Sequence, residues 1–262
     1  MMMNSNCETT DGQLTKLFLE GRVTVLTGAG VSTESGLPDF RGREGLWTGT
    51  DLLELLSAEG IKAHPEEFAD FCRKAIHEVE SHQPNMIHQM LAHLQQVRLV
   101  QTIITQNVDG YHQAAGATNV LEVHGNLRRL RCDACEKRFE PTAGRTLGEA
   151  CGCGGALRSD IVLFGEMLPK EVYASAVNAL MDTDLLVIMG TTLQVAPVSE
   201  APALVKANGG KVAIFNNEPT DWDAIADFKQ TGQLSRKMRA FYQFLIKYDR
   251  GAHGIAPAQA LS

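Results

Sequence analysis

The chain has 262 residues, of which 44% are hydrophobic and 21% are charged, and its formal net charge is -7. This length fits one large α/β domain with a small insert. No apolar run reaches the roughly 18 residues of a membrane span, and the acidic balance disfavours nonspecific attraction to nucleic-acid phosphates. The N-terminus has neither the basic start nor the apolar stretch of a secretory signal, so we expect a cytoplasmic protein.

Short apolar runs alternate with helical patterns along most of the chain. The runs, rich in valine and isoleucine as buried parallel strands are, are Val23 to Thr27, Val100 to Thr105, Leu185 to Met189 and Val212 to Phe215. The helical patterns are Leu14 to Glu20, Pro65 to Val79, Asn85 to Gln96, Lys170 to Met181, Pro197 to Asn208 and Gln233 to Lys247. This alternation predicts a Rossmann-like, doubly wound parallel sheet. Ligands bind such sheets beyond the carboxyl ends of the strands, where polar residues follow all of these runs.

Residues 128–158 break this rhythm with cysteines, glycines and charges but show no strong helical period. This change of pattern predicts a small module at residues 128–158. The module is inserted in a larger domain that consists of residues 14–127 and 159–248. That larger domain carries a helical insertion at about residues 45–84. Residues 249–262 are rich in glycine, alanine and proline and have few large apolar side chains, so we expect a disordered tail there.

The inserted module holds four cysteines at metal-ligand spacing. Cys132 and Cys135 are followed, after fifteen residues, by Cys151 and Cys153. Two close pairs supply the four thiolates of a closed structural zinc site, which leaves no position for a catalytic water. The second pair is C-x-C where C-x-x-C is commoner, and unliganded thiols or a redox pair are the alternatives. A disulfide framework is not expected in a cytosolic protein of this size.

A glycine-rich segment, TGAGVSTESGLPDFRG, follows the first predicted strand. Gly28 and Gly30 would let the backbone approach a pyrophosphate closely, and a helix beginning near Ser32 would direct its amides and positive dipole end at the phosphates. Thr33 stands where the dinucleotide-binding fingerprint has its third glycine. Taken alone, the two glycines fit a dinucleotide site and a tight strand-to-helix turn about equally well.

Amides, a carboxylate and a histidine follow the second predicted strand. Gln106, Asn107 and Asp109 can hydrogen-bond ribose hydroxyls and a carboxamide, although Asn-Val-Asp-Gly is also an ordinary turn sequence. His124 can accept a proton near neutral pH, because an unperturbed imidazole has a pKa of about 6.5. One histidine among eight is more often structural than catalytic. His112, in the helix expected after Asp109, is the competing candidate.

The longer strings around these residues closely resemble the signatures of the sirtuin family. Gly-Ala-Gly-Val-Ser precedes Glu-Ser-Gly-Leu-Pro-Asp-Phe-Arg after the first strand, and Gln-Asn-Val-Asp precedes His-Gly at the sirtuin interval. Three more segments resemble family motifs in the family's order, and these are IVLFGEMLP (161–169), GTTLQVAPVS (190–199) and FNNEPT (215–220). The resemblance covers about residues 14–248. Ser159 stands where the family usually has proline, and Thr192 where it usually has serine.

The resemblance implies that NAD binds at the predicted site. The glycine-rich segment would surround the phosphates and the nicotinamide end with Gly28, Ala29, Gly30, Ser32, Asp39, Phe40 and Arg41. Residues after the later strands would contact the riboses, the nicotinamide and the phosphates, and these are Gln106, Asn107, Asp109, Gly190, Thr191, Thr192 and Asn216. The segment that would bind an extended substrate peptide contains Val162, Phe164, Gly165 and Glu166. In it, Val162 would touch the acyl-lysine, and the other three residues would form the pairing strand.

The implied activity is NAD-dependent removal of acyl groups from protein lysines, with His124 as the base and Asn107 in the reacting site. Nicotinamide would leave, and the acyl group would pass to ADP-ribose. An ADP-ribosyltransferase that uses the same site, a silent NAD-sensing or zinc-ribbon module, and a dehydrogenase are alternatives. Sirtuins that remove succinyl or malonyl groups carry Tyr and Arg before a Pro-Asn pair. Cys72 and Ala75 fall near those places here, so we expect apolar acyl groups, from acetyl to longer chains.

Overall fold

The computed structural model describes residues 10–37, 50–140, 144–249 and 251–255. Its larger part is a parallel sheet with strand order β3-β2-β1-β7-β8-β9. The strands are β1 (Val23–Thr27), β2 (Thr102–Thr105), β3 (Val120–Glu122), β7 (Leu185–Met189), β8 (Lys211–Asn216) and β9 (Phe228–Thr231). The chain order changes direction between β1 and β7, and this switch point is where doubly wound sheets bind their ligands.

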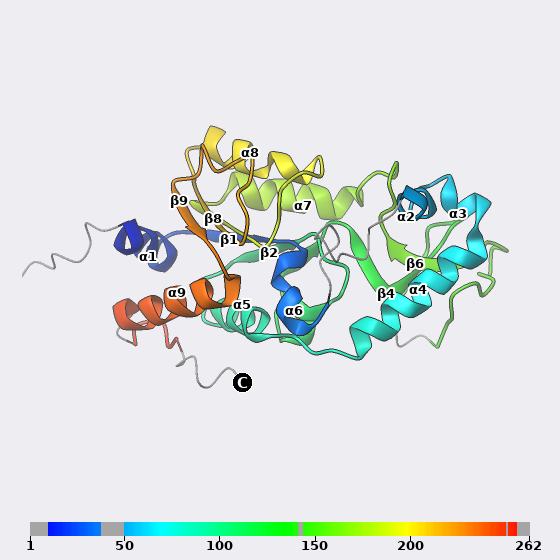
Figure 1. Cartoon of the computed structure of the whole chain (residues 1–262), viewed down its shortest axis with the longest axis horizontal. Coiled ribbons are helices and arrows are strands. Elements are labelled where there is room, and N and C mark those ends of the chain that lie inside the picture. The colour runs from blue at the N-terminus through cyan, green and yellow to red at the C-terminus, as the bar shows by residue number, and fades with distance from the viewer. Residues whose placement is uncertain (1–9, 38–49, 141–143, 250, 256–262) are drawn as a thin grey trace, which may run out of the picture.

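Helices cover both faces of this sheet, as Figure 1 shows. One face carries α1 (Thr10–Glu20), α5 (Met86–Gln96) and α9 (Leu234–Asp249), and the other carries α7 (Lys170–Met181) and α8 (Ala201–Ala207). Val25 packs into the first of these cores and Leu26 into the second, because successive strand residues point to opposite faces. Among the described residues, no helix combines the length and the apolar character that crossing a membrane requires.

A small antiparallel sheet, with strand order β5-β4-β6, lies to one side of the parallel sheet (Figure 1). Its strands are β4 (Gly125–Cys132), β5 (Arg138–Phe139) and β6 (Leu157–Ile161), and the helices at this end of the molecule are α2 (Thr50–Leu55), α3 (Gly60–Ala63) and α4 (Pro65–Glu80). Phe68 and Cys72 of α4 share an apolar cluster with Leu127 and Ile161 of the small sheet. This end of the molecule therefore has a core of its own.

Most of the predicted elements are present. Val23–Thr27, Leu185–Met189 and Lys170–Met181 have the predicted bounds, and the other predicted elements differ by one to four residues at an end. The edge strand β9 was not predicted. It buries only Phe228 of its four residues, so it lacks the continuous apolar run of a central strand.

The helix expected near Ser32 is not formed by the residues that the structure describes there. Two 3₁₀ helices, Ala29–Val31 and Thr33–Ser35, take its place. Gly36 follows them with φ of 95°, a left-handed conformation that ends helical backbone. The loop is therefore a series of tight turns, and the expectation of a regular helix dipole was wrong.

The tail expected from Asp249 onward is wrong at its start. Asp249 is the last residue of α9 and is buried. Its carboxylate accepts a hydrogen bond from the His253 amide at 3.0 Å, and Ile255 packs into the core that α1, α5 and α9 cover. Residue 250 and residues 256–262 lie outside the described residues.

We expect Phe18→Ala to lower the free energy of unfolding by about 3–5 kcal/mol, because the substitution leaves a cavity where a fully buried side chain was. The Phe18 ring packs edge-on against Phe241 at a centroid distance of 5.3 Å, and Phe241 packs against Phe215 at 5.5 Å. Urea unfolding followed by circular dichroism measures the change. Met181→Ala, at a side chain that is 52% exposed, is the control and should change stability by no more than about 0.5 kcal/mol. Equal losses would contradict the assignment of Phe18 to the core.

Candidate active site and metal centre

The glycine-rich loop after β1 packs against the loop after β7. Gly28 and Gly30 donate backbone hydrogen bonds to the carbonyl oxygens of Met189 and Gly190, at 3.0 and 2.8 Å. A Cβ atom on Gly30 would lie 2.8 Å from the Gly190 Cα atom, and Gly190 has φ of 62°, which favours glycine. These glycines are therefore required by the close approach of two loops at the switch point.

A buried polar cluster adjoins the glycine-rich loop. Ser32 Oγ donates to Asp109 Oδ2 at 2.8 Å, and Asn107 Nδ2 donates to Ser32 Oγ at 3.1 Å. Asn107 is 2% exposed, and its Oδ1 atom has no hydrogen-bond partner among the described residues. A buried acceptor without a donor costs about 1–3 kcal/mol. The nicotinamide carboxamide and the ribose hydroxyls are donors that would satisfy it, so the cluster fits NAD.

Two histidines pack against this cluster in their neutral form. His88 Nδ1 accepts a hydrogen bond from the Asn85 amide at 3.2 Å, and His112 Nε2 lies 2.9 Å from Thr27 Oγ1. Burial lowers the pKa of His112 to about 4. Burial also lowers the pKa of His88, and repulsion between the two rings when protonated adds to this shift. His112 lies on α6 (Tyr111–Ala114) and is only 1% exposed. It is a core histidine, and it lies in the helix that was expected after Asp109.

His124 lies in the short connection between β3 and β4 and is partly exposed. Its Nδ1 atom is 3.1 Å from the Gln106 carbonyl oxygen, a contact that favours the tautomer with its proton on Nδ1 and its lone pair on Nε2. Gly125 follows with φ of 81° and turns the chain into β4. Gln106 and Asn107 are consecutive, so one loop holds both the imidazole and the buried amide oxygen.

The other predicted NAD residues lie at the carboxyl ends of the same strands. Gln106 Nε2 donates to Thr191 Oγ1 at 3.0 Å and so links the loops after β2 and β7. Thr192 is half-buried, and Asn216 is buried at the end of β8, where it donates to the Glu218 carbonyl at 2.8 Å. The three residues predicted to cover the nicotinamide end lie outside the described residues, and these are Asp39, Phe40 and Arg41.

The predicted peptide-binding segment begins with residues that are already hydrogen-bonded. The Val162 amide donates to the His124 carbonyl at 2.9 Å. The Phe164 amide donates to the Leu56 carbonyl at 2.9 Å, and the Phe164 carbonyl accepts from the Ala58 amide at 3.1 Å. Both main-chain groups of Phe164 are therefore occupied, whereas its side chain is 43% exposed. In this conformation Phe164 can contact a peptide through its ring but not extend a strand towards it.

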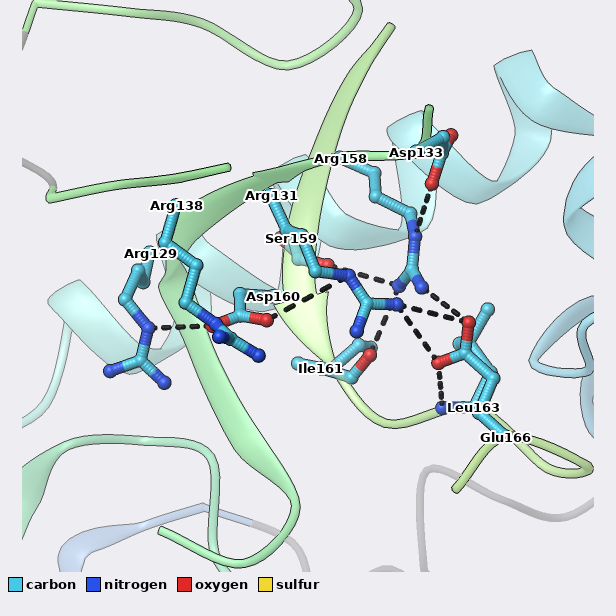
Figure 2. A network of polar contacts seen from close by, with 10 residues as sticks. All are labelled: Arg129, Arg131, Asp133, Arg138, Arg158, Ser159, Asp160, Ile161, Leu163 and Glu166. Atoms are coloured by element: carbon cyan, nitrogen blue, oxygen red, sulfur yellow. Dashed lines mark hydrogen bonds and ion pairs between the residues drawn. The ribbon is translucent and has the colours of Figure 1, made fainter. Parts of the chain in front are cut away.

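Gly165 and Glu166 continue this segment as a turn. Gly165 has φ of 86°, and the Glu166 amide donates back to the Leu163 carbonyl at 3.0 Å. The Glu166 side chain points into the small module, where it meets Arg131 and Arg158 (Figure 2). The strand expected over these residues is thus a tight turn, because the left-handed glycine reverses the chain.

The four cysteines converge in the small module. All four Sγ atoms lie within 4.8 Å of one another, with Cys132 and Cys153 at 3.5 Å and Cys135 and Cys151 at 3.8 Å. Zinc–sulfur bonds of about 2.3 Å in a tetrahedron place sulfur atoms about 3.8 Å apart, so this set fits one zinc ion. The Cys135 amide, by hydrogen-bonding the Cys132 sulfur, lowers the pKa of Cys132 to about 7, which favours the thiolate that zinc binds.

Fold and site together define a nucleotide-binding α/β protein with an inserted zinc module. The model of the Sir2 family matches residues 28–197. The NAD-dependent protein deacetylase of Oceanobacillus iheyensis is 42% identical over 216 residues, which are 82% of this chain and 92% of that protein. The chain therefore belongs to the Sir2 family, which confirms the sirtuin resemblance.

Solved structures of the family extend this likeness to the whole fold. A Sir2 homolog–NAD complex superposes with a TM-score of 0.82 at 35% identity and covers 92% of this chain and 94% of its own. Sir2Tm bound to a propionylated peptide superposes with a TM-score of 0.76 at 30% identity and covers 93% of this chain and 98% of its own.

Sequence reasoning missed the charged network of the small module. Strand β6 reads Leu-Arg-Ser-Asp-Ile, and all five of its residues are buried. Charges inside a buried strand must be paired. Had this strand been predicted, that criterion would have identified Arg158 and Asp160 as members of a buried ion-pair network. Ser159, the departure from the family's proline, donates from Oγ to the Leu127 carbonyl at 2.7 Å, beside the register shift between β4 and β6. The serine thus satisfies a carbonyl that the shift leaves outside the ladder.

We expect one equivalent of zinc per purified chain, measured by mass spectrometry of the metal. Removing it with a strong chelator, or making Cys132→Ala, should expose the β4–β5 connection to limited proteolysis, because the metal joins segments that few apolar contacts hold. Cys72→Ala changes a buried cysteine outside the cluster, and this control should retain its zinc. A wild-type chain with less than half an equivalent would contradict the assignment.

We expect the free energy of unfolding to fall as the pH is lowered from about 6.5 towards 4. The unfolded chain protonates His112 below the ordinary pKa of about 6.5, whereas the folded chain resists protonation down to about pH 4. The slope can reach about 1.4 kcal/mol per pH unit for His112, and His88 adds to it. Urea unfolding at several pH values measures the slope. His112→Gln should reduce the slope and the exposed His77→Gln should not, whereas equal slopes in the wild type and His112→Gln would contradict neutral burial of His112.

Proposed function

We propose that this chain is an NAD-dependent protein-lysine deacylase, which releases nicotinamide and passes the acyl group to ADP-ribose. The observation that carries the proposal is the arrangement of Gln106 and Asn107. The Gln106 carbonyl lies 3.1 Å from His124 Nδ1, and the buried Asn107 Oδ1 has no donor within the described part of the chain. The loop after β2 therefore carries the unmatched acceptor and contacts the base, beside the switch point where dinucleotides bind doubly wound sheets.

Bound NAD would supply an electrophilic ribose carbon with nicotinamide as its leaving group. Asn107 Oδ1 would accept a hydrogen bond from the carboxamide or a ribose hydroxyl, while Ser32 holds the Asn107 amide nitrogen and Asp109 holds Ser32. The remaining contacts to phosphate and ribose would come from Gly28, Ala29, Gly30, Gln106, Gly190, Thr191, Thr192 and Asn216. The cluster is held by its own hydrogen bonds, so the Asn107 Oδ1 acceptor is positioned before the ligand arrives.

His124 would act as the general base towards a ribose hydroxyl. The Gln106 carbonyl keeps the proton on Nδ1, so Nε2 presents the lone pair that removes the hydroxyl proton. An imidazole is suited to this step because its ordinary pKa lies near neutral pH. His112 cannot replace it, since that ring is enclosed in the core.

The acyl-lysine would enter beside Val162, whose amide is tied to the carbonyl of His124. Cys72 is fully buried in an apolar cluster with Leu163, and Ala75 packs against that cluster. Burial raises the pKa of Cys72 to about 11, so its thiol is neutral near pH 7. Neither Cys72 nor Ala75 can pair with a carboxylate, which favours acetyl and longer apolar acyl groups over succinyl groups.

The proposed partners are acyl-lysine proteins and peptides. A cytoplasmic location stays a prediction, and its support is the cosubstrate, because NAD is supplied by the metabolism of the cell. The distinction from an ADP-ribosyltransferase rests on the reaction products, since both activities would use the same NAD site.

We expect nicotinamide release that depends on an acyl-lysine peptide, and acyl-ADP-ribose as the second product. Acetyl- and longer-acyl peptides should react at least about tenfold faster than a succinyl peptide, a difference of about 1.4 kcal/mol in the barrier. His124→Ala should lower the rate by about 10²–10⁴-fold, as the loss of a general base does. Chromatography of nicotinamide and mass spectrometry of the products measure these outcomes.

The matched control is His77→Ala, because His77 is an exposed histidine of α4. It should react like the wild type. A protein that gains the mass of ADP-ribose would instead identify an ADP-ribosyltransferase. Equal rates with succinyl and acetyl peptides would refute the apolar preference and leave the deacylase assignment intact.

A further inference from the structure

Arg158 connects three segments of the small module through one side chain. It lies on β6 and is 5% exposed. Its Nε atom donates to Asp133, Nη1 donates to the Ile161 carbonyl at 3.0 Å, and Nη2 donates to Glu166 (Figure 2). Asp133 lies between the predicted zinc ligands Cys132 and Cys135. One guanidinium thus joins the zinc loop, the end of β6 and the turn that follows β6.

Glu166 closes that turn from its other end. Its amide donates to the Leu163 carbonyl at 3.0 Å, and its Oε2 atom accepts a hydrogen bond from the Leu163 amide at 3.0 Å. The same carboxylate accepts from Arg131 Nη2 at 3.0 Å and from Arg158. Between them, Gly165 has an amide and a carbonyl with no hydrogen-bond partner among the described residues. The turn therefore holds its own main chain in place and leaves one residue able to bond a peptide.

The network separates into two groups of charges, as Figure 2 shows. Asp160, which is 3% exposed, pairs with Arg129 at 2.7 Å and with Arg138 at 2.8 Å. Arg158 instead reaches the zinc loop and Glu166, and Arg131 lies between the two groups. Arg158 and Arg131 both reach the turn through Glu166. The three contacts that Arg158 makes need the planar fork of an arginine. A lysine ammonium cannot reach three differently placed acceptors at once.

The turn is also tied to the predicted base. The Val162 amide donates to the His124 carbonyl at 2.9 Å, and Ile161 pairs with Gly125 across β6 and β4. Residues 162–166 are therefore fixed at one end to the His124 segment and at the other to Arg158. A shift of Glu166 would move Gly165 relative to the His124 segment, and the main-chain groups of Gly165 would then meet a bound peptide less well.

We propose that Arg158 and Glu166 are positioning residues for the acyl-lysine peptide. They hold the 163–166 turn so that Gly165 presents its main chain beside the His124 segment, and Asp133 extends this support to the zinc loop. This inference rests on the proposed function, because it assigns a role to the peptide side of that site. NAD binding does not depend on it, since the NAD residues lie at the carboxyl ends of the parallel strands.

The test compares Arg158→Lys and Glu166→Gln with Arg138→Gln. Lysine keeps the charge but loses the fork, and glutamine keeps an oxygen for the Leu163 amide but weakens the contact with Arg158. Affinity for a fluorescent acetyl-lysine peptide should fall about tenfold in both variants, and the KM for peptide should rise by the same factor. The KM for NAD, kcat at saturating peptide and the zinc content should stay within about twofold of the wild type.

Arg138→Gln removes an arginine of the same network that is 44% exposed and pairs with Asp160 away from the turn. It should bind peptide like the wild type. Combining Arg158→Lys with Glu166→Gln should weaken peptide binding no further than either change alone. Both substitutions break the same contact, the one between Arg158 and Glu166.

Unchanged peptide affinity in both variants would overturn the positioning role. A parallel loss of zinc, NAD affinity and kcat would also overturn it, because it would mean that Arg158 and Glu166 only stabilise the fold. A wild-type chain that binds the peptide without releasing nicotinamide would refute the proposed function but leave the positioning role standing. A wild-type chain that does not bind the peptide would refute both.

Discussion

The close contact between the loops after β1 and β7 is the constraint on which the site depends. Parallel pairing places the carboxyl ends of β1, β2, β7 and β8 along one edge of the sheet. Between β1 and β7 the order in which the chain adds strands reverses direction, which makes this point the switch point. Gly30 and Gly190 then approach so closely that neither tolerates a Cβ atom. The loops that follow can meet only because of this approach, and Gln106 bonds to Thr191 across the same edge. The sheet thus fixes the positions of the polar residues before any ligand contributes.

Burial controls the chemistry of the groups behind that edge. His88, His112 and Asp109 are enclosed. Burial lowers the pKa of the two histidines and raises the pKa of Asp109, so it favours the neutral form of each. His124, in contrast, is partly exposed and has its Nδ1 atom beside a carbonyl. Identical imidazoles therefore sit in different environments, and burial disfavours the charged form of His88 and His112. The enclosed groups belong to the packed interior behind the loops, whereas the His124 ring lies partly at the surface.

The small module depends on charge and metal where the large domain depends on apolar packing. Its own cluster is small and is formed by Leu130, Cys132, Cys151 and Leu157. Four thiols gather there, and arginines pair with the buried carboxylate of Asp160. Small domains commonly need such support, because a short chain buries too little apolar surface. Arg158 carries that support from the zinc loop to the turn beside the predicted base.

The sequence alone determined the four central strands of the large sheet, most of its helices, the cysteine set and the choice of family. Apolar periodicity, ligand spacing and long motifs are local properties. It predicted His124 over His112 only through resemblance. Tertiary structure decided which polar atoms are buried, that Asn107 Oδ1 finds no donor in the ranges that the structure describes, and that Glu166 turns inward to Arg158. It also replaced the expected helix near Ser32 with 3₁₀ turns. Those features depend on contacts between residues far apart in the chain, and no local pattern encodes them.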